Sequence, residues 1–497
     1  MLPFFLRFHL RVTQLSNSRQ KTGVCCITYE IRSEGRSRMK KFLSLLLALS
    51  LLMVSAFALS EGEAPAMPEG AEGERPAMPD GEMPGDPPSG GMPGGGNGMP
   101  GGGGGMPGSS SSSDLTYTAS VEITSADTQE NQTYASETAD ESALLISTAD
   151  AVTLVNPTVT KTGDSDGGDN CNFYGLNAAL LVKDGSTATI TGGTVTSSAS
   201  GANGVFSYGG NGGQNGASGD GTTVYISGTT ITTTGNGSGG IMTTGGGITY
   251  ASDLTVTTSG GSSAPIRTDR GGGWVYVDGG TYTSNGLGSP AIYSTAEIHV
   301  ANATLISNLS EGVCIEGKNS IELTDCDLTA NNTRCNGNAT FLDTIMIYQS
   351  MSGDADSGTS AYTMTGGSLT SKNGHMFHVT NTHAVITLSG VTLVNEDDAN
   401  VLLSVCDDGW SGASNIAELN ASGQALEGTI LVGSNSTLTL SLTDGSSFVG
   451  AISGEIANAS GTTVSTEVGS VSVTLDETST WTLTCPVRQP GQGVLHK

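Results

Sequence analysis

Three closely spaced aspartates form the first cluster in the sequence that is suited to chemistry. Asp164, Asp166 and Asp169 lie within the stretch GDSDGGDN, residues 163–170. Carboxylates at spacings of two and three can bind one Ca²⁺ together with backbone carbonyls. The stretch lacks the acidic twelfth position of an EF-hand loop, and Asp side chains that accept local backbone N–H bonds in consecutive turns are the competing interpretation. Calcium loop and tight turns therefore both stay open.

Aromatic side chains form a second candidate site, one suited to binding sugars. In GWVYVD, residues 273–278, period-two alternation places Trp274 and Tyr276 outward if the valines between and after them point inward. Tyr225 occupies the position equivalent to Tyr276 and also faces outward. Aromatic rings on such a face can stack on sugar rings, which makes these three residues candidate glycan contacts. The competing interpretation is a solvated bend with one amphipathic tryptophan.

The elements that would position these residues follow from a repeated phrase. Two apolar residues five apart bracket four small or polar residues, and the spacing between copies is 23 or 24, or longer where insertions intervene. The copies are Leu154/Val159, Ile190/Val195, Ile226/Ile231, Val277/Tyr282, Val300/Leu305, Leu323/Leu328, Met364/Leu369 and Leu388/Leu393. A degenerate copy is expected near DLTVTT, residues 253–258. Period-two apolar positions with Gly, Asn or Asp breaks predict short strands joined by turns.

A strand repeat of this length with no helical pattern predicts an all-β solenoid, a single-stranded parallel β-helix. Inward Ile, Val and Leu would stack from coil to coil, and outward Thr would line the surface. A β-sandwich is the competitor, but it does not account for the return of one phrase at a fixed period. Outward Thr-x-Thr pairs such as Thr194/Thr196 also suit an ice-binding face, although this pattern decays after Thr304.

Composition and charge limit the classes of function. The chain has 497 residues with 73 Gly, 5% aromatic residues and a formal net charge of −28. Residues 114–484 contain 37 Asp and Glu against 7 Lys and Arg. Phosphate binding needs clustered cations, so nucleic acid is disfavoured as a partner. An acidic polysaccharide would also be repelled unless calcium intervened.

The N-terminal region predicts export. Residues 39–58, MKKFLSLLLALSLLMVSAFA, combine lysines, an apolar run and an A-x-A site, as a secretory signal does. Residues 1–38 precede it and are expected to be a mis-called start. Residues 59–113 repeat Met-Pro and continue into poly-Gly and poly-Ser, which predicts a disordered linker. Residues 114–484 form the predicted β-helix, and residues 485–497 read as an irregular, frameshifted or truncated tail. No later apolar run is long enough to span a membrane.

A family resemblance adds to this interpretation. The signal, the Met-Pro-Gly tract and the region GDSDGGDNCNFYGLNAALLVKDGSTATITGGTV resemble secreted bacterial right-handed parallel β-helix proteins of the pectate-lyase-like superfold, which are often adhesin-like. The likeness covers roughly residues 114–484. It implies an extracellular or cell-surface, monomeric, non-catalytic protein that binds extracellular polysaccharides or host and cell-surface proteins. No cofactor is required, and Ca²⁺ is the one that the aspartates suggest.

The same superfold supplies the alternative function, a Ca²⁺-dependent polysaccharide lyase or a glycoside hydrolase. Such lyases combine a carboxylate-bound Ca²⁺ with an Arg or Lys base. Arg267 and Arg270 are the one close pair of bases in the repeat region, and Asp269 and Asp278 lie near them in sequence. These four residues are the catalytic candidates if the protein is an enzyme, and the non-catalytic function is preferred.

The remaining titratable residues give no recognisable catalytic pattern. Adjacent acids in a strand face opposite sides, so the pairs Asp397/Asp398 and Asp407/Asp408 are expected in turns. The histidines share no ligand spacing with carboxylates: His299, His375, His378 and His383. The cysteines after the signal follow no disulfide or C-x-x-C framework, and buried free thiols are expected.

Overall fold

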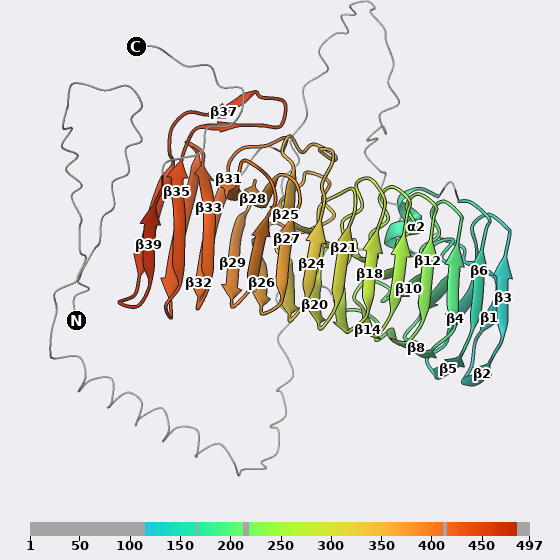
Figure 1. Ribbon diagram of the computed structural model, residues 1–497. Coiled ribbons are helices and arrows are strands. Elements are labelled where there is room, and N and C mark those ends of the chain that lie inside the picture. Colours follow the sequence, from blue (N-terminus) through green and yellow to red (C-terminus); the bar gives the residue numbers. More distant parts are fainter. Residues whose placement is uncertain (1–114, 166, 212–217, 411–414, 485–497) are drawn as a thin grey trace, which may run out of the picture. The chain divides into compact units, whose positions relative to one another are not determined.

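The computed structural model describes residues 115–484 except 166, 212–217 and 411–414 (Figure 1). The predicted signal (39–58), the residues before it (1–38), the linker (59–113) and the tail (485–497) lie outside the described residues. Asp166 of the candidate calcium loop also lies outside them. In the described part, the search for a long apolar helix able to cross a membrane finds none.

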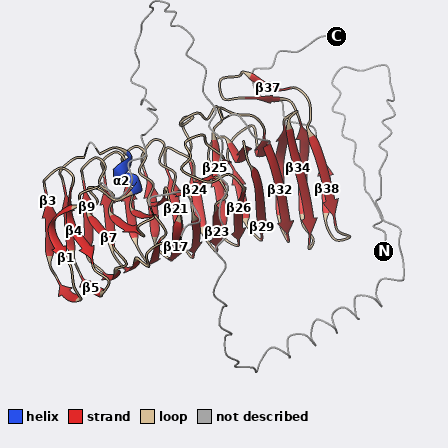
Figure 2. Cartoon of the chain, turned by 180° about the vertical axis from the view of Figure 1, so that it is seen from behind, coloured by secondary structure: helices blue, strands red, loops and turns tan. Residues whose placement is uncertain are grey.

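The described residues form the predicted parallel β-helix. Up to β30 the chain passes in turn through three sheets, here called A, B and C, and after β30 its long parallel strands alternate between sheets A and B. Strands of neighbouring coils pair in parallel. Figures 1 and 2 show the strands of successive coils side by side. Register confirms the period, because Thr281 pairs with Thr304 and Thr304 with Asp327, a separation of 23 residues.

Sheet A contains fourteen described strands: β1 (Thr118–Ile123), β4 (Glu141–Ser147), β7 (Leu180–Lys183), β10 (Val205–Tyr208), β13 (Ile241–Thr244), β16 (Ile266–Thr268), β19 (Ile292–Ser294), β22 (Val313–Glu316), β25 (Asp343–Tyr348), β28 (His375–Thr380), β31 (Val401–Val405), β33 (Ala425–Val432), β35 (Ser447–Ser453) and β39 (Thr480–Leu483). Sheet B contains thirteen: β2 (Asp127–Glu130), β5 (Ala151–Val155), β8 (Thr187–Thr191), β11 (Thr223–Ser227), β14 (Gly247–Ser252), β17 (Gly273–Asp278), β20 (Glu297–Ala301), β23 (Ser320–Thr324), β26 (Thr359–Thr365), β29 (His383–Ser389), β32 (Asn415–Ser422), β34 (Ser436–Thr443) and β38 (Ser470–Leu475). Sheet C contains ten: β3 (Thr133–Ser136), β6 (Thr158–Lys161), β9 (Thr194–Ser197), β12 (Thr230–Thr233), β15 (Thr255–Thr258), β18 (Thr281–Ser284), β21 (Thr304–Ser307), β24 (Asp327–Ala330), β27 (Ser368–Ser371) and β30 (Thr392–Asn395). The short strands β36 (Ile456–Ala457) and β37 (Thr463–Ser465) pair antiparallel.

The core consists of aliphatic columns that run through the coils. In sheet C, Val159, Val195 and Ile231 are register partners in consecutive coils, and all three are completely buried. The degenerate copy predicted near residues 253–258 is β15, whose Val256 continues this column beside Ile231. Burying one such side chain contributes about 1.5–3 kcal/mol, so the columns are the main source of stability.

The outward face of sheet C carries threonine in two columns. Thr194 and Thr196 pair with Thr230 and Thr232 of the next coil, and the pattern continues in β15 and β18. At β21 the second column changes to Ile306. The alternation of buried and exposed residues in these strands is the one expected for a sheet with one face in the core.

Sheet A differs from the other two because chain segments cover its outer face. The five-residue helix α2 (Asp169–Phe173) and the loop after it place Phe173 and Tyr174 against Phe206 and Met242. Further along, Trp410 packs against Met346 and Tyr348. Strands of sheet A are consequently buried on both sides, whereas sheet B keeps its outer face open.

Candidate functional site

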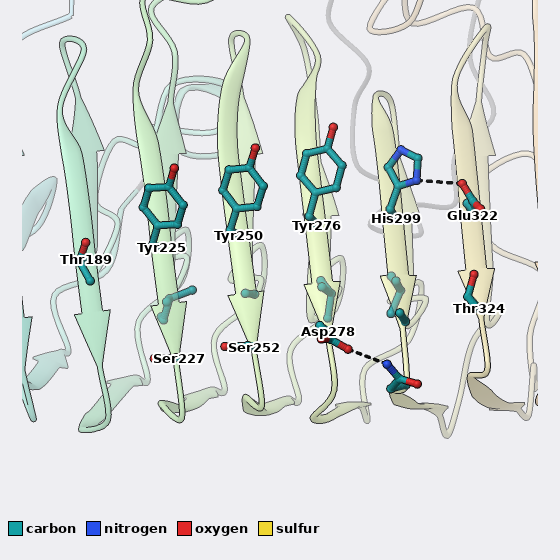
Figure 3. A pocket seen from close by; sticks show the side chains of 16 residues that line it. Thr189, Tyr225, Ser227, Tyr250, Ser252, Tyr276, Asp278, His299, Glu322 and Thr324 are labelled. Carbon is teal, nitrogen blue, oxygen red and sulfur yellow. Dashed lines mark hydrogen bonds and ion pairs between the residues drawn. The ribbon is translucent and has the colours of Figure 1, made fainter. Parts of the chain in front are cut away.

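One outward column of sheet B contains four consecutive aromatic rungs. Tyr225 pairs in register with Tyr250, Tyr250 with Tyr276, and Tyr276 with His299. Figure 3 shows these side chains on neighbouring strands, followed by Glu322 on β23. We call these four residues the aromatic ladder. In the coils before and after the ladder, the same column continues with threonine: Thr153 and Thr189, then Thr363 and Thr387.

The rungs of the ladder stack on one another. The ring centroids of Tyr225 and Tyr250 are 5.0 Å apart with planes inclined by 7°, and those of Tyr250 and Tyr276 are 5.0 Å apart at 12°. The ring of His299 lies 5.1 Å from that of Tyr276 at 11°. Parallel rings in van der Waals contact are about 3.5 Å apart, so centroids at this separation mean offset rings. Tyr225 and Tyr250 are 45% and 40% exposed, which leaves ring surface available to a ligand.

An open groove of about 700 Å³ follows the ladder, and its volume is in the range of ligand-binding clefts. A second outward column, two residues further along each strand, forms the polar side of the groove. Ser227, Ser252 and Asp278 are register partners in this column, and Thr324 lines the groove further along. Asp278 also accepts a hydrogen bond from Asn302 Nδ2 at 2.7 Å. Hydroxyl and carboxylate groups thus lie parallel to the stacked rings.

The end of the ladder is held by two carboxylates. His299 Nδ1 lies 3.0 Å from Glu322 Oε2, and His299 Nε2 lies 2.8 Å from Glu297 Oε1. Burial, with the charge of Glu297 in addition, raises the pKa of Tyr276, so its hydroxyl keeps its proton and can donate.

Trp274 faces outward, as predicted, but lies outside the ladder. Its register partners are Ile248 and Glu297, one column away from Tyr276. It lines a neighbouring groove of about 350 Å³ together with Lys318. The prediction that Tyr225 and Tyr276 are equivalent is confirmed by the register, with Tyr250 between them.

The four catalytic candidates do not form one site. Arg267 NH2 pairs with Asp269 Oδ2 at 2.8 Å, and Arg270 NH2 pairs with Asp354 Oδ1 at 2.6 Å. Arg270 also lies 4.1 Å from the centre of the Phe173 ring. These residues lie at the sheet A end of the turn before β17, whereas Asp278 is the last residue of β17 and faces the groove.

Burial changes the proton affinity of Asp269. The side chain is 4% exposed, and desolvation raises its pKa to about 6 although the Arg267 ion pair acts in the opposite direction. The carboxyl group accepts hydrogen bonds from Arg267 and from the backbone N–H of Arg270, and Asp269 is not among the residues that line the groove of the ladder. Asp269 is therefore a titratable structural group in a covered turn.

Two of the three calcium candidates, Asp164 and Asp169, lie in the described part. Asp164 Oδ1 accepts a hydrogen bond from the backbone N–H of Ser200 at 2.8 Å, which joins two neighbouring coils. Asp169 is the first residue of α2. Among the described residues no group of three or more His, Cys, Asp or Glu side chains is arranged to hold a metal ion. Calcium binding stays a prediction, because Asp166 is not described.

A buried polar cluster behind sheet A is the site that sequence reasoning missed. The Nδ1 atoms of His375 and His378 lie 2.8 and 2.7 Å from Ser404 Oγ, and His378 Nε2 lies 3.3 Å from Asp408 Oδ2. The sequence showed no ligand spacing between these histidines and carboxylates, and the contact of His378 with Asp408 arises from residues 30 positions apart. Asp343 is completely buried nearby, and burial, followed by the charges of neighbouring acids, raises its pKa well above the usual value.

The cluster has no access for a large substrate. His378, Ser404 and the Asp408 side chain are completely buried, and no groove described above reaches them. Burial, with the neighbouring His378 in addition, lowers the pKa of His375 to about 3, so this ring is neutral at ordinary pH. Sequence analysis missed this cluster because it depends on the segment around residue 408, which folds back over β28. No repeat in the sequence encodes that fold-back.

The cysteine prediction is confirmed for the described residues. The five cysteines there form no disulfide with one another, and all but Cys335 are buried: Cys171, Cys314, Cys326, Cys335 and Cys406. Burial raises the pKa of Cys314 well above the usual value and thus keeps it as a thiol.

Comparisons with protein family models, with curated proteins and with solved structures find no match to this chain. The fold is defined by the three parallel sheets, and the candidate site by the aromatic ladder and its groove.

Proposed function

We propose that this chain is a secreted, adhesin-like β-helix protein that binds extracellular or cell-surface glycans without cleaving them, with the aromatic ladder as its contact surface. The resemblance to secreted bacterial β-helix proteins and the signal at residues 39–58 support export. One observation carries the proposal: four stacked aromatic rungs replace threonine in a single column. Solubility does not require exposed tyrosines. Stacked rings can contact the apolar face of a sugar, and the neighbouring row of hydroxyl groups can bond to its polar edge.

The groove chemistry favours binding over cleavage. Glu297 and Glu322 both contact His299, and Asp278 accepts from Asn302, so each of these carboxylates already has a partner. The arginines proposed for a lyase lie at the other end of β17 and form ion pairs. The lyase alternative needs an Arg or Lys base in the groove, and the described lining residues include neither.

A panel of extracellular polysaccharides, tested by affinity electrophoresis, examines the proposal. We expect retardation by at least one neutral polysaccharide, and loss of about tenfold in affinity for Tyr250→Ala, since removal of a central stacking contact costs on the order of 1.4 kcal/mol. Thr257→Ala is the matched control, because Thr257 lies in the same coil on the outer face of sheet C. Release of unsaturated or reducing-end products would support the enzyme instead. Equal affinities of Tyr250→Ala and the wild type would reject the ladder.

A further inference from the structure

A single lysine interrupts an inward polar column of sheet C. Lys161, the last residue of β6, is completely buried, and its register partners are Ser136 and Ser197. The column continues through further hydroxyl residues, Thr233 and Thr258. Burying an ammonium group is costly unless it is paired, so a lysine in a serine and threonine column needs an explanation of its own.

The amine of Lys161 is held by backbone carbonyls alone. Its Nζ donates to Thr138 O at 2.7 Å and to Gly163 O at 2.5 Å. In the described part of the chain, no carboxylate lies within ion-pair distance of this nitrogen. Burial lowers the pKa of Lys161, while the charge of Glu141 acts in the opposite direction. A buried lysine with a lowered pKa can act as a nucleophile through its neutral amine.

The side-chain amide of Asn177 lies against the same carbonyl. Asn177 is 1% exposed, and its Nδ2 donates to Gly163 O at 3.0 Å, the oxygen that Lys161 Nζ also contacts. The amide oxygen, Oδ1, is buried and has no hydrogen-bond partner. An unsatisfied buried acceptor is unfavourable, so the amide is both close to the amine and incompletely stabilised.

We propose that Lys161 and Asn177 form an intramolecular isopeptide bond. The Lys161 Nζ lone pair attacks Asn177 Cγ, the Cγ–Nδ2 bond breaks, and the former side-chain amino group leaves as ammonia. Of the two protons on the neutral amine, one stays in the new amide and the other leaves with the ammonia. No oxidant or reductant takes part. The proton moves from the attacking amine to the leaving amino group within the step, so the atoms balance with the two side chains alone.

The bond would tie the end of β6 to the residues that precede β7. The segment between them contains GDSDGGDN and α2, which places Phe173 and Tyr174 over sheet A. Closing this loop covalently restricts the unfolded chain and stabilises the fold by the same loop-closure argument that applies to a disulfide. Unlike a disulfide, the bond forms without oxidation.

Mass spectrometry of the purified full chain tests the inference. We expect an intact mass lower than the sequence mass by one ammonia, and a protease digest in which the peptides containing Lys161 and Asn177 are recovered joined to each other. Cyclisation at an Asn-Gly step such as Asn203-Gly204 also releases ammonia, so the joined peptide decides the question. Recovery of both peptides separately and at full yield would overturn the inference.

Two variants provide controls that do not depend on glycan binding. Lys161→Met and Asn177→Ala should each lack the joined peptide, and each should melt at a lower temperature than the wild type. Lys183→Met removes a partly buried lysine that pairs with Asp184, and it should keep the joined peptide. If the joined peptide persisted in Asn177→Ala, Lys161 would be linked to another side chain and the assignment of Asn177 would be wrong.

Discussion

The rungs of the ladder are chemically unlike the rest of their column, and this difference is visible only when single residues are aligned in register. Tyr225 and Tyr276 could be matched from the sequence because their coils repeat the apolar phrase clearly. Tyr250 was missed because its coil has Ala251 where the neighbouring coils have larger aliphatic residues. His299 was examined only for ligand spacing with carboxylates, which it lacks, and not as a stacking ring, so the fourth rung was missed too.

Stacking, not hydrogen bonding, should dominate the contribution of Tyr276. We expect Tyr276→Ala to weaken glycan binding by about three- to tenfold, whereas Tyr276→Phe keeps the ring and most of the affinity. Trp274→Ala should have a smaller effect, since Trp274 lines the neighbouring groove. Isothermal titration with the best polysaccharide fragment measures all three variants. A larger loss for Trp274→Ala than for Tyr276→Ala would move the contact surface to that groove.

His375 should make stability depend on pH. Its folded pKa of about 3 is below the ordinary value of 6.5, so the unfolded chain takes up the proton first as pH falls. The stability that depends on the neutral ring is fully present above pH 6.5 and is lost as pH falls from there toward 3, at up to about 1.4 kcal/mol per pH unit. Urea unfolding between pH 7 and 5 should show a shallower pH slope for His375→Asn than for the wild type.

His383→Asn is the matched control for this measurement, because His383 is partly exposed and pairs with Glu418 at the surface. Its slope between pH 7 and 5 should resemble that of the wild type. Identical slopes for His375→Asn and the wild type would show that other groups in the buried cluster determine the acid sensitivity.

At the scale of strands and turns, the repeat predicted the features that depend on local residue spacing, namely which residues face inward and where the turns fall. The bracketing pairs such as Ile190/Val195 lie inward as expected, and the turns fall at Gly, Asn and Asp residues. The segments that cover sheet A could not be predicted, because α2 and the region around Trp410 occur once and follow no period. Their burial of sheet A depends on contacts with distant residues, which the sequence pattern does not specify.

Two glycines in the turns between sheets B and C should respond differently to substitution. Gly193 has φ +75°, and a Cβ there would lie 2.2 Å from Pro157 O, whereas Gly228 has φ +60° with open space around it. Gly228→Ala should cost about 1–2 kcal/mol from the left-handed conformation alone. Gly193→Ala adds a backbone clash between coils and should cost clearly more. Urea unfolding compares the pair, and equal losses would contradict the tight contact between the coils.

The charge of the whole molecule should select among polysaccharides. With a formal net charge of −28, the chain repels uronic acid polymers at low ionic strength, and the groove adds the carboxylates of Asp278 and Glu322. We expect neutral polysaccharides to bind better than polygalacturonate in chelator, with the difference reduced at high salt. Tight binding of polygalacturonate at low salt without calcium would contradict this electrostatic argument.

Each coil pairs with its neighbours through columns of residues in register, and this regularity has a consequence for evolution. A gene duplication that copies one complete coil would find matching columns above and below it, so the new rung fits without redesign of the interior. In this way, the row of stacked rings could be lengthened or shortened by one coil at a time. The number of consecutive sugar units that the proposed binding surface contacts would change with it.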